Sequence, residues 1–105
     1  MTRPEHRYAL RLEMHREAVE QLKAQPKLCA VPLEVVQRWK ASSGHDPRLL
    51  EWERLIQECR WDPFLADGDI GDELRKGSPV VFVLTPEARL RIVRRYPIYQ
   101  IQLRK

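Results

Sequence analysis

Arginine and lysine side chains are concentrated near the end of the chain, in the stretch TPEARLRIVRRYPIYQIQLRK at residues 85–105. Residues 75–105 hold eight basic residues and one acidic residue, whereas residues 31–74 hold five basic and ten acidic residues. An arginine guanidinium presents several N–H donors in a planar fork that matches carboxylate and phosphate groups. This composition therefore favours the binding of an anionic partner.

A helical pattern over residues 86–96 divides this stretch into two faces. The apolar face consists of Ala88, Leu90, Ile92, Val93 and Tyr96. We predict a basic face on the opposite side of the helix and in the residues beyond it. Its candidate binding residues are Arg91, Arg94, Arg95, Arg104 and Lys105.

Arg89 falls within the apolar face of the same predicted helix. An unpaired guanidinium buried there would be costly, so either its stem carries the charge out to solvent or the charge meets a carboxylate. The candidate carboxylates lie in the run DGDIGDE and are Asp67, Asp69, Asp72 and Glu73. The same run could also neutralise the neighbouring arginines. Two alternatives follow: internal neutralisation of the basic residues, or a basic face open to a partner.

The open basic face leads to three hypotheses about function. The first is a small, intracellular, non-enzymatic binding module that engages an acidic macromolecule, with a protein surface favoured over nucleic acid. Tyr96 and Tyr99 are expected in the core and so offer no platform for stacking bases. The alternative is a nucleic-acid-binding regulator, with DNA as one candidate ligand, that uses the same arginines on phosphates. The third hypothesis is a small enzyme whose site has no recognisable sequence pattern.

Cysteine and histidine form no metal-binding pattern in this sequence. Cys29 and Cys59 permit one disulfide, but in the absence of a secretory context we expect both thiols to be reduced. His6, His15 and His45 lack the His-x-x-x-His spacing, and none lies close in sequence to a cysteine. We therefore predict no metal site and no cofactor.

The bulk composition is typical of a folded domain. The chain has 105 residues, of which 43% are hydrophobic and 32% charged, and its net charge is +4. Apolar runs are all much shorter than the roughly 20 residues that span a bilayer, and no export signal is visible. We expect one domain over residues 1–105, located in the cytoplasm and without membrane contact.

The elements that position the basic face are expected to form an α+β fold with about four helices and a small sheet. We predict a helical part at about 7–61, an acidic connector at 62–79 and a strand–helix–strand unit at 80–105. Residues 7–14 are ambiguous. Their apolar residues alternate as in a strand, but Tyr8, Leu12, His15, Val19 and Leu22 also follow helical spacing.

The remaining elements follow from capping residues and apolar runs. Asp46 and Pro47 predict the start of a helix that runs to about Arg60. Its buried stripe is predicted to contain Leu49, Trp52, Leu55, Ile56 and Cys59. Thr85 and Pro86 predict the start of the helix that carries the basic face. The apolar run VVFVL at 80–84 and the alternating residues 98–103 predict two strands, with 7–14 as a third candidate.

Overall fold

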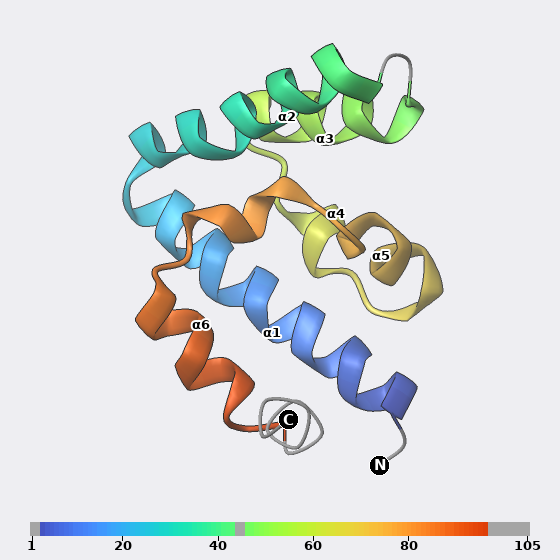
Figure 1. Ribbon diagram of the computed structural model, residues 1–105, viewed down its shortest axis with the longest axis vertical. Helices are drawn as coiled ribbons and strands as arrows, with labels where there is room; N and C mark the ends of the chain where they lie inside the picture. The colour runs from blue at the N-terminus through green and yellow to red at the C-terminus, as the bar shows by residue number, and fades with distance from the viewer. Residues whose placement is uncertain (1–2, 44–45, 97–105) are drawn as a thin grey trace.

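The computed structural model describes residues 3–43 and 46–96, and these form helices joined by short connections (Figure 1). They contain six α-helices and two 3₁₀ helices, which are labelled η. In chain order they are α1 (Arg3–Ala24), η1 (Pro26–Cys29), α2 (Ala30–Ser43), α3 (Pro47–Gln57), α4 (Asp62–Leu65), α5 (Gly68–Arg75), η2 (Pro79–Val83) and α6 (Pro86–Val93).

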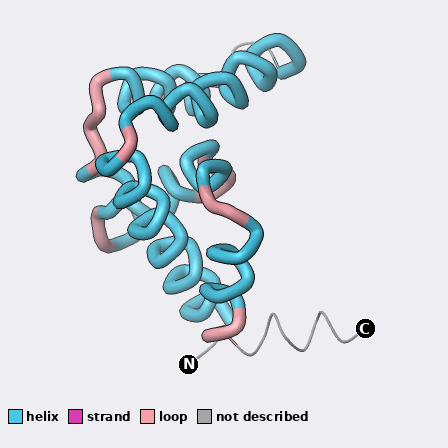
Figure 2. The backbone as a smooth tube through the Cα atoms, turned by 90° about the vertical axis from the view of Figure 1, so that its left-hand side faces the viewer, coloured by secondary structure: helices cyan, strands magenta, loops and turns pink. Residues whose placement is uncertain are grey.

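Most of the other elements pack against the long helix α1 (Figure 1). It contacts α4, α5, α6 and both 3₁₀ helices, while α2 packs against α3 and η2. The pair formed by α2 and α3 lies at one end of the molecule, and α6 runs beside α1 toward the other end (Figures 1 and 2). Among the helices described, none is both long enough and apolar enough to cross a membrane.

The core lies between α1 and the helices that surround it. Ala18, Val19 and Leu22 of α1 are buried and pack with buried side chains of α2, α3, α4, α6 and η2. Those side chains include Val36, Leu49, Trp52, Leu55, Ile56, Phe64, Val80, Ala88 and Ile92. Trp52 also donates its indole N–H to the backbone oxygen of Leu74 at 2.8 Å, which ties α3 to the end of α5.

The predicted starts of α3 and α6 are confirmed by their capping bonds. The side chain of Asp46 accepts the backbone N–H of Arg48 at 2.9 Å, and Pro47 is the first residue of α3. The hydroxyl of Thr85 accepts the backbone N–H of Ala88 at 3.1 Å, and Pro86 is the first residue of α6. Both caps satisfy N–H groups that have no partner inside the helix.

The predicted α+β fold is wrong, because the described part of the chain contains no strand and no sheet. Residues 7–14 belong to α1, and Val80 to Val83 belong to η2. Ser78 directs this outcome locally, since its hydroxyl accepts the N–H of Val80 at 3.1 Å and Pro79 fits the first helical position. The third predicted strand, at 98–103, lies outside the described residues.

The predicted acidic connector at 62–79 contains more regular structure than its sequence indicates. It holds the short helices α4 and α5 and the start of η2. Phe64 in α4 is fully buried, and Asp72 and Arg75 in α5 are buried too. This segment is thus part of the packed structure, and two of its charged residues lie inside it.

The end of α3 differs from the prediction as well. The helix ends at Gln57, and Cys59 is exposed with a φ of 55°, whereas helical spacing places it on the buried stripe. The backbone N–H of Arg60 bonds the oxygen of Leu55 at 2.9 Å, and that of Cys59 bonds the oxygen of Ile56 at 3.1 Å. These two bonds define a Schellman motif with Cys59 at the left-handed position that usually holds glycine.

We therefore expect the substitution Cys59→Gly to stabilise the protein by about 1 kcal/mol under reducing conditions. Glycine adopts the left-handed backbone without the steric cost, about 1–2 kcal/mol, that a Cβ incurs, although it loses more entropy on folding. Urea unfolding of the reduced proteins measures the difference. Cys59→Ala is the control, because it removes the thiol but keeps the Cβ. Equal stabilities of the two variants would contradict the prediction.

Candidate functional site

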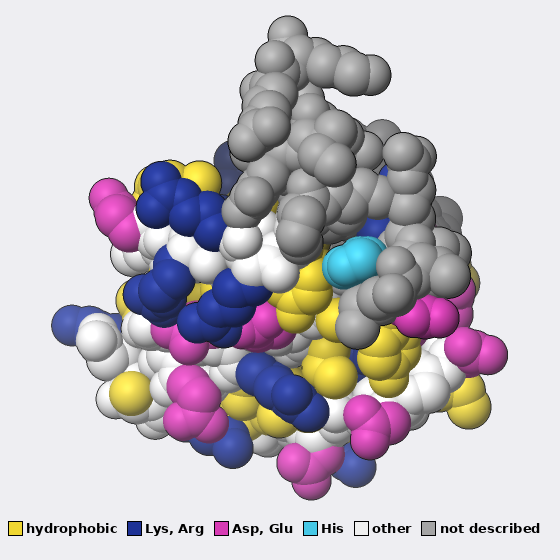
Figure 3. Space-filling model, turned by 90° about the horizontal axis from the view of Figure 1, so that it is seen from below, with side chains coloured by type: hydrophobic (Ala, Val, Ile, Leu, Met, Phe, Trp, Pro, Cys, Tyr) yellow, Lys and Arg dark blue, Asp and Glu magenta, His cyan; other side chains and the backbone are white. Residues whose placement is uncertain are grey.

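The predicted basic face lies on α6 and the turn that follows it, where three arginines project away from the core. Ala88 and Ile92 are buried against the rest of the molecule, and Arg91, Arg94 and Arg95 are exposed. Seen from the end of the molecule that is lowest in Figure 1, basic and acidic side chains lie interspersed on the surface (Figure 3). The other two predicted binding residues, Arg104 and Lys105, lie outside the described residues.

Two arginines of this face are held by carboxylates from α1. Arg91 donates to Oε1 of Glu17 at 3.2 Å, and Arg95 forms an ion pair with Oε1 of Glu13. The hydroxyl of Tyr96 donates to the second oxygen of Glu13 at 2.6 Å, which fixes that carboxylate. The Arg91 and Arg95 side chains nevertheless remain 57% and 56% exposed. Each guanidinium can still donate to a further acceptor from solvent.

The carboxylates that bind Arg91 and Arg95 thus come from α1 and not from the acidic run at 67–73. Within that run, Glu73 pairs with Lys76 at 2.7 Å, and Asp72 pairs with Arg11. Asp67 and Asp69 are exposed at the start of α5. Asp72 and Glu73 are therefore paired with cations other than Arg91 and Arg95.

Arg89 binds a backbone oxygen in place of the predicted carboxylate. Its Nη2 donates to the backbone oxygen of Val81 at 2.9 Å, and its guanidinium lies 5.5 Å from the centre of the Phe82 ring. A carbonyl and an aromatic face both favour a cation at this half-buried position. Arg89 therefore fastens α6 to η2 and does not belong to the exposed basic face.

A second group of charged side chains lies between α1 and α5, with Asp72 and Arg75 buried and Arg11 half-buried. No pattern in the sequence predicted this group. Arg11 donates from Nε and Nη2 to both carboxylate oxygens of Asp72, at 2.8 and 2.6 Å. This bond, more than any other cause, holds the pKa of Asp72 below its ordinary value. The bidentate geometry is the strongest form of such a pair. It fixes α5 against the middle of α1.

Arg75 lies beneath this pair and is 1% exposed. Its Nη1 donates to the backbone oxygens of Phe64 and Ala66, at 3.1 and 2.7 Å, and its guanidinium lies 5.3 Å from the centre of the Tyr8 ring. These contacts join the end of α5 to the segment that leads out of α4. Arg75 therefore supports the fold of residues 62–75 and is not accessible to a partner.

His15 and Ser78 form a buried pair that resembles the base and nucleophile of a hydrolase. The His15 Nε2 and the Ser78 hydroxyl are 2.8 Å apart, and Nδ1 lies 2.7 Å from the backbone oxygen of Arg11. Since a carbonyl only accepts, Nδ1 carries the proton and Nε2 accepts from the serine. Burial lowers the pKa of His15 from 6.5 to about 4, so the ring is neutral at pH 7.

The burial of this pair argues for a structural role. His15 is 1% exposed and Ser78 is 2% exposed, and the serine hydroxyl also accepts the N–H that starts η2. A catalytic pair must be within reach of a substrate atom. The pair instead links the centre of α1 to η2. His15 could have been recognised as a core residue from its place on the helical stripe of Leu12, Val19 and Leu22.

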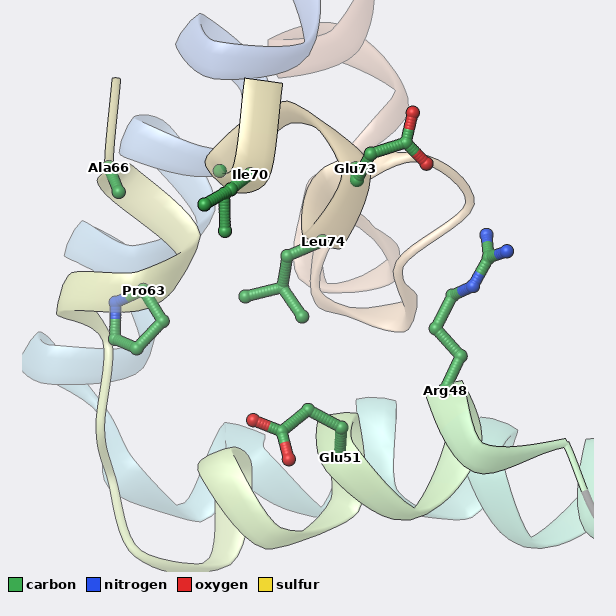
Figure 4. A pocket seen from close by; sticks show the side chains of 8 residues that line it. Arg48, Glu51, Pro63, Ala66, Ile70, Glu73 and Leu74 are labelled. Carbon is green, nitrogen blue, oxygen red and sulfur yellow. The ribbon is translucent and has the colours of Figure 1, made fainter. Parts of the chain in front are cut away.

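A surface pocket of about 360 Å³ lies between α3, α4 and α5 (Figure 4). Leu74 points into it, with Pro63 and Ile70 as further apolar walls, and Glu51 and Arg48 rise from α3 at its rim. Glu51 already binds Arg54 at 2.9 Å, as Glu73 binds Lys76. The pocket therefore offers apolar contacts, while its carboxylates are occupied by neighbouring cations.

The described residues contain no cluster of histidine, cysteine or acidic side chains that could hold a metal ion. Comparisons of the chain with models of protein families, with characterised proteins and with solved structures found no match.

Proposed function

We propose that this protein is a small binding module that docks on an acidic protein surface through the exposed arginines of α6 and of the turn after it. The observation that carries the proposal is the exposure of Arg91, Arg94 and Arg95 at the end of α6 and in the turn after it. Arg91 and Arg95 are oriented by carboxylates of α1. Glu17 and Glu13 restrict the guanidinium groups in advance, which lowers the entropy lost when a partner binds.

The interspersed carboxylates are the reason to favour a protein over a nucleic acid. Glu13 and Glu17 lie directly beside Arg95 and Arg91, where they would repel a continuous line of phosphates. A protein surface presents separate carboxylates among neutral and basic groups, and arginine binds each of them with its planar fork. The proposal extends to a cytoplasmic location, because the two cysteines are free thiols and cytosolic conditions keep thiols reduced.

Retention of the protein on immobilised poly-glutamate tests the proposal, with immobilised duplex DNA as the comparison. We expect the wild type to bind poly-glutamate at low salt, and the triple variant Arg91→Gln, Arg94→Gln, Arg95→Gln to lose about tenfold in affinity. Three partly exposed charge contacts, each contributing roughly 0.5 kcal/mol, give a loss of this size. Binding of the wild type should also weaken as salt is raised.

The matched control is a triple variant with the same change in net charge at other exposed positions. Lys27, Arg38 and Arg60 are exposed and lie outside α6, so their substitution by glutamine should leave most of the retention intact. Equal losses in both triple variants would mean that only net charge matters and would defeat the proposal. Tighter retention on duplex DNA than on poly-glutamate would replace it with the nucleic-acid alternative.

A further inference from the structure

The pocket between α3, α4 and α5 has a charged side and an apolar side (Figure 4). Arg48 and Glu73 lie on one side of it, and Pro63 and Ile70 lie on the other. Leu74 points into the space between them. The volume of about 360 Å³ falls within the range of pockets that bind small molecules. The shape therefore fits a small ligand with a charged head and an apolar tail.

The apolar side of the pocket is exposed to solvent. Ile70 is 89% exposed, and the other apolar walls of the pocket include Pro63, Ala66 and Leu74. Single exposed apolar side chains are common on protein surfaces, but this one adjoins a cavity that an alkyl chain can fill. The bond from the Trp52 indole to the backbone oxygen of Leu74 holds this wall in place. Transfer of an alkyl chain from water into the pocket is therefore favourable.

The ion pairs at the rim indicate the charge of the head group. Glu51 pairs with Arg54 at 2.9 Å. Glu73 pairs with Lys76 at 2.7 Å, so each of these carboxylates already has a cation beside it. Arg48 is exposed, and among the described residues its guanidinium has no hydrogen bond or ion pair. Its planar fork is thus available to a ligand and matches a carboxylate.

We propose that this pocket binds a small organic acid, with its carboxylate on Arg48 and its hydrocarbon chain against Ile70 and Leu74. Fatty acids of medium length and acids with a branched or aromatic side group belong to this class. Lys76 offsets the charge of Glu73, so that this glutamate does not exclude an anion from the rim. The site lies apart from the arginines of α6 and does not depend on the function proposed above.

A series of ligands with the same alkyl chain and different head groups tests the proposal. Octanoate is an anion at neutral pH, octanol is uncharged and octylammonium is a cation. NMR titration of the isotope-labelled protein gives both the affinity and the place of binding, from the amide signals of Ile70 and Leu74 and the indole signal of Trp52. We expect octanoate to bind with a Kd of about a millimolar, octanol about fivefold more weakly, and octylammonium most weakly.

Two substitutions with matched controls assign the two ends of the ligand. Arg48→Gln should weaken the binding of octanoate about fivefold, the size typical of one exposed ion pair, and leave octanol unchanged. Arg38→Gln, in α2 and outside the pocket, should change neither. Ile70→Gln should weaken both ligands about fivefold, because it removes an apolar wall. Leu50→Gln removes a side chain that is 55% exposed outside the pocket and should have no effect.

These four side chains are exposed, so the variants should fold like the wild type, which their NMR spectra check. Binding of octylammonium as tight as that of octanoate would overturn the proposal, because the rim glutamates would then select the head group. An unchanged affinity of Arg48→Gln for octanoate would overturn it too. So would an absence of saturable shifts at millimolar octanoate, or shifts centred on the core around Phe64 and not on Ile70 and Leu74.

Discussion

The substitution Gly71→Ala is expected to destabilise the protein by about 3 kcal/mol, although alanine is the better helix former. Gly71 lies within α5 and is buried. A Cβ atom at this position would lie 2.8 Å from the backbone carbon of Ala66 and closer still to its oxygen. Real Cβ atoms do not approach backbone atoms so closely, so α5 and the segment after α4 would have to separate.

The separation is costly because the same backbone oxygen of Ala66 accepts a bond from buried Arg75, at 2.7 Å. When this oxygen moves, the guanidinium loses one of the two backbone acceptors that its Nη1 has. A buried cation with a lost hydrogen bond adds about 1–3 kcal/mol to the cost of the steric overlap. The close approach of α5 to Ala66 therefore explains why glycine occupies position 71.

Urea unfolding followed by circular dichroism measures this effect. The matched control is Gly68→Ala, because a Cβ at position 68 would meet no atom within 4 Å. The only cost of this substitution comes from the left-handed backbone of Gly68, whose φ is 88°. That variant should lose about 1 kcal/mol, the cost of a left-handed backbone for alanine. A stability of Gly71→Ala equal to that of Gly68→Ala, or higher, would show that no tight contact exists at Ala66.

The helices that the sequence predicted correctly are those with local signals. α3 and α6 each begin with a side-chain cap followed by proline, and the structure has the expected capping bonds at Asp46 and Thr85. Such signals depend on residues within one helical turn, so they can be recognised without knowledge of the fold. The buried stripe of α3, which includes Trp52, follows in the same way from helical spacing.

The predicted sheet failed because an apolar run indicates burial but not backbone conformation. Val80 is fully buried, as its sequence context suggested, yet the backbone there is a 3₁₀ helix. A strand needs a neighbour to pair with, and the candidate at 7–14 is part of α1. The decisive local signal was Ser78 followed by Pro79, a cap and first helical residue like those of α3 and α6.

The candidate sites show the same division between local and non-local information. The exposed side of α6 could be predicted from its own sequence, whereas the carboxylates that bind Arg91 and Arg95 come from α1, at the other end of the sequence. Periodicity within one element carries no information about such partners.

Acidification from pH 6.5 to pH 4 is expected to remove about 3 kcal/mol of stability through His15 alone. Burial lowers the pKa of this histidine from 6.5 to about 4, so the folded state keeps it neutral in this range while the unfolded state takes up a proton. Stability is therefore complete above pH 6.5 and is lost as the pH falls toward 4, because the proton favours the unfolded chain. Below pH 4 this loss reaches its limit.

The loss of stability through His15 has to be distinguished from the loss through the charged groups around it. Arg75 and Arg11 disfavour a proton on the ring and Asp72 favours it, while the Ser78 hydroxyl and the backbone oxygen of Arg11 bind the neutral ring. The pKa of Asp72 is itself lowered, so the stability contributed by its pair with Arg11 is present above its ordinary value of 3.8 and is lost only at lower pH. The loss of stability through His15 is therefore nearly complete at pH 4, where most of the loss through Asp72 has still to occur.

Urea unfolding at pH 7, 6, 5 and 4, with the wild type and His15→Gln side by side, tests this prediction. The glutamine amide can donate to the oxygen of Arg11 and accept from Ser78, but it does not titrate. The variant should be less stable than the wild type at pH 7, since it loses the ring contact with Phe64, and its stability should change much less between pH 6.5 and 4. The same loss of stability in both proteins between pH 6.5 and 4 would mean that other groups are responsible. If the buried neutral His15 at the junction of α1 and η2 is the cause, the wild type must lose much more stability on acidification than His15→Gln.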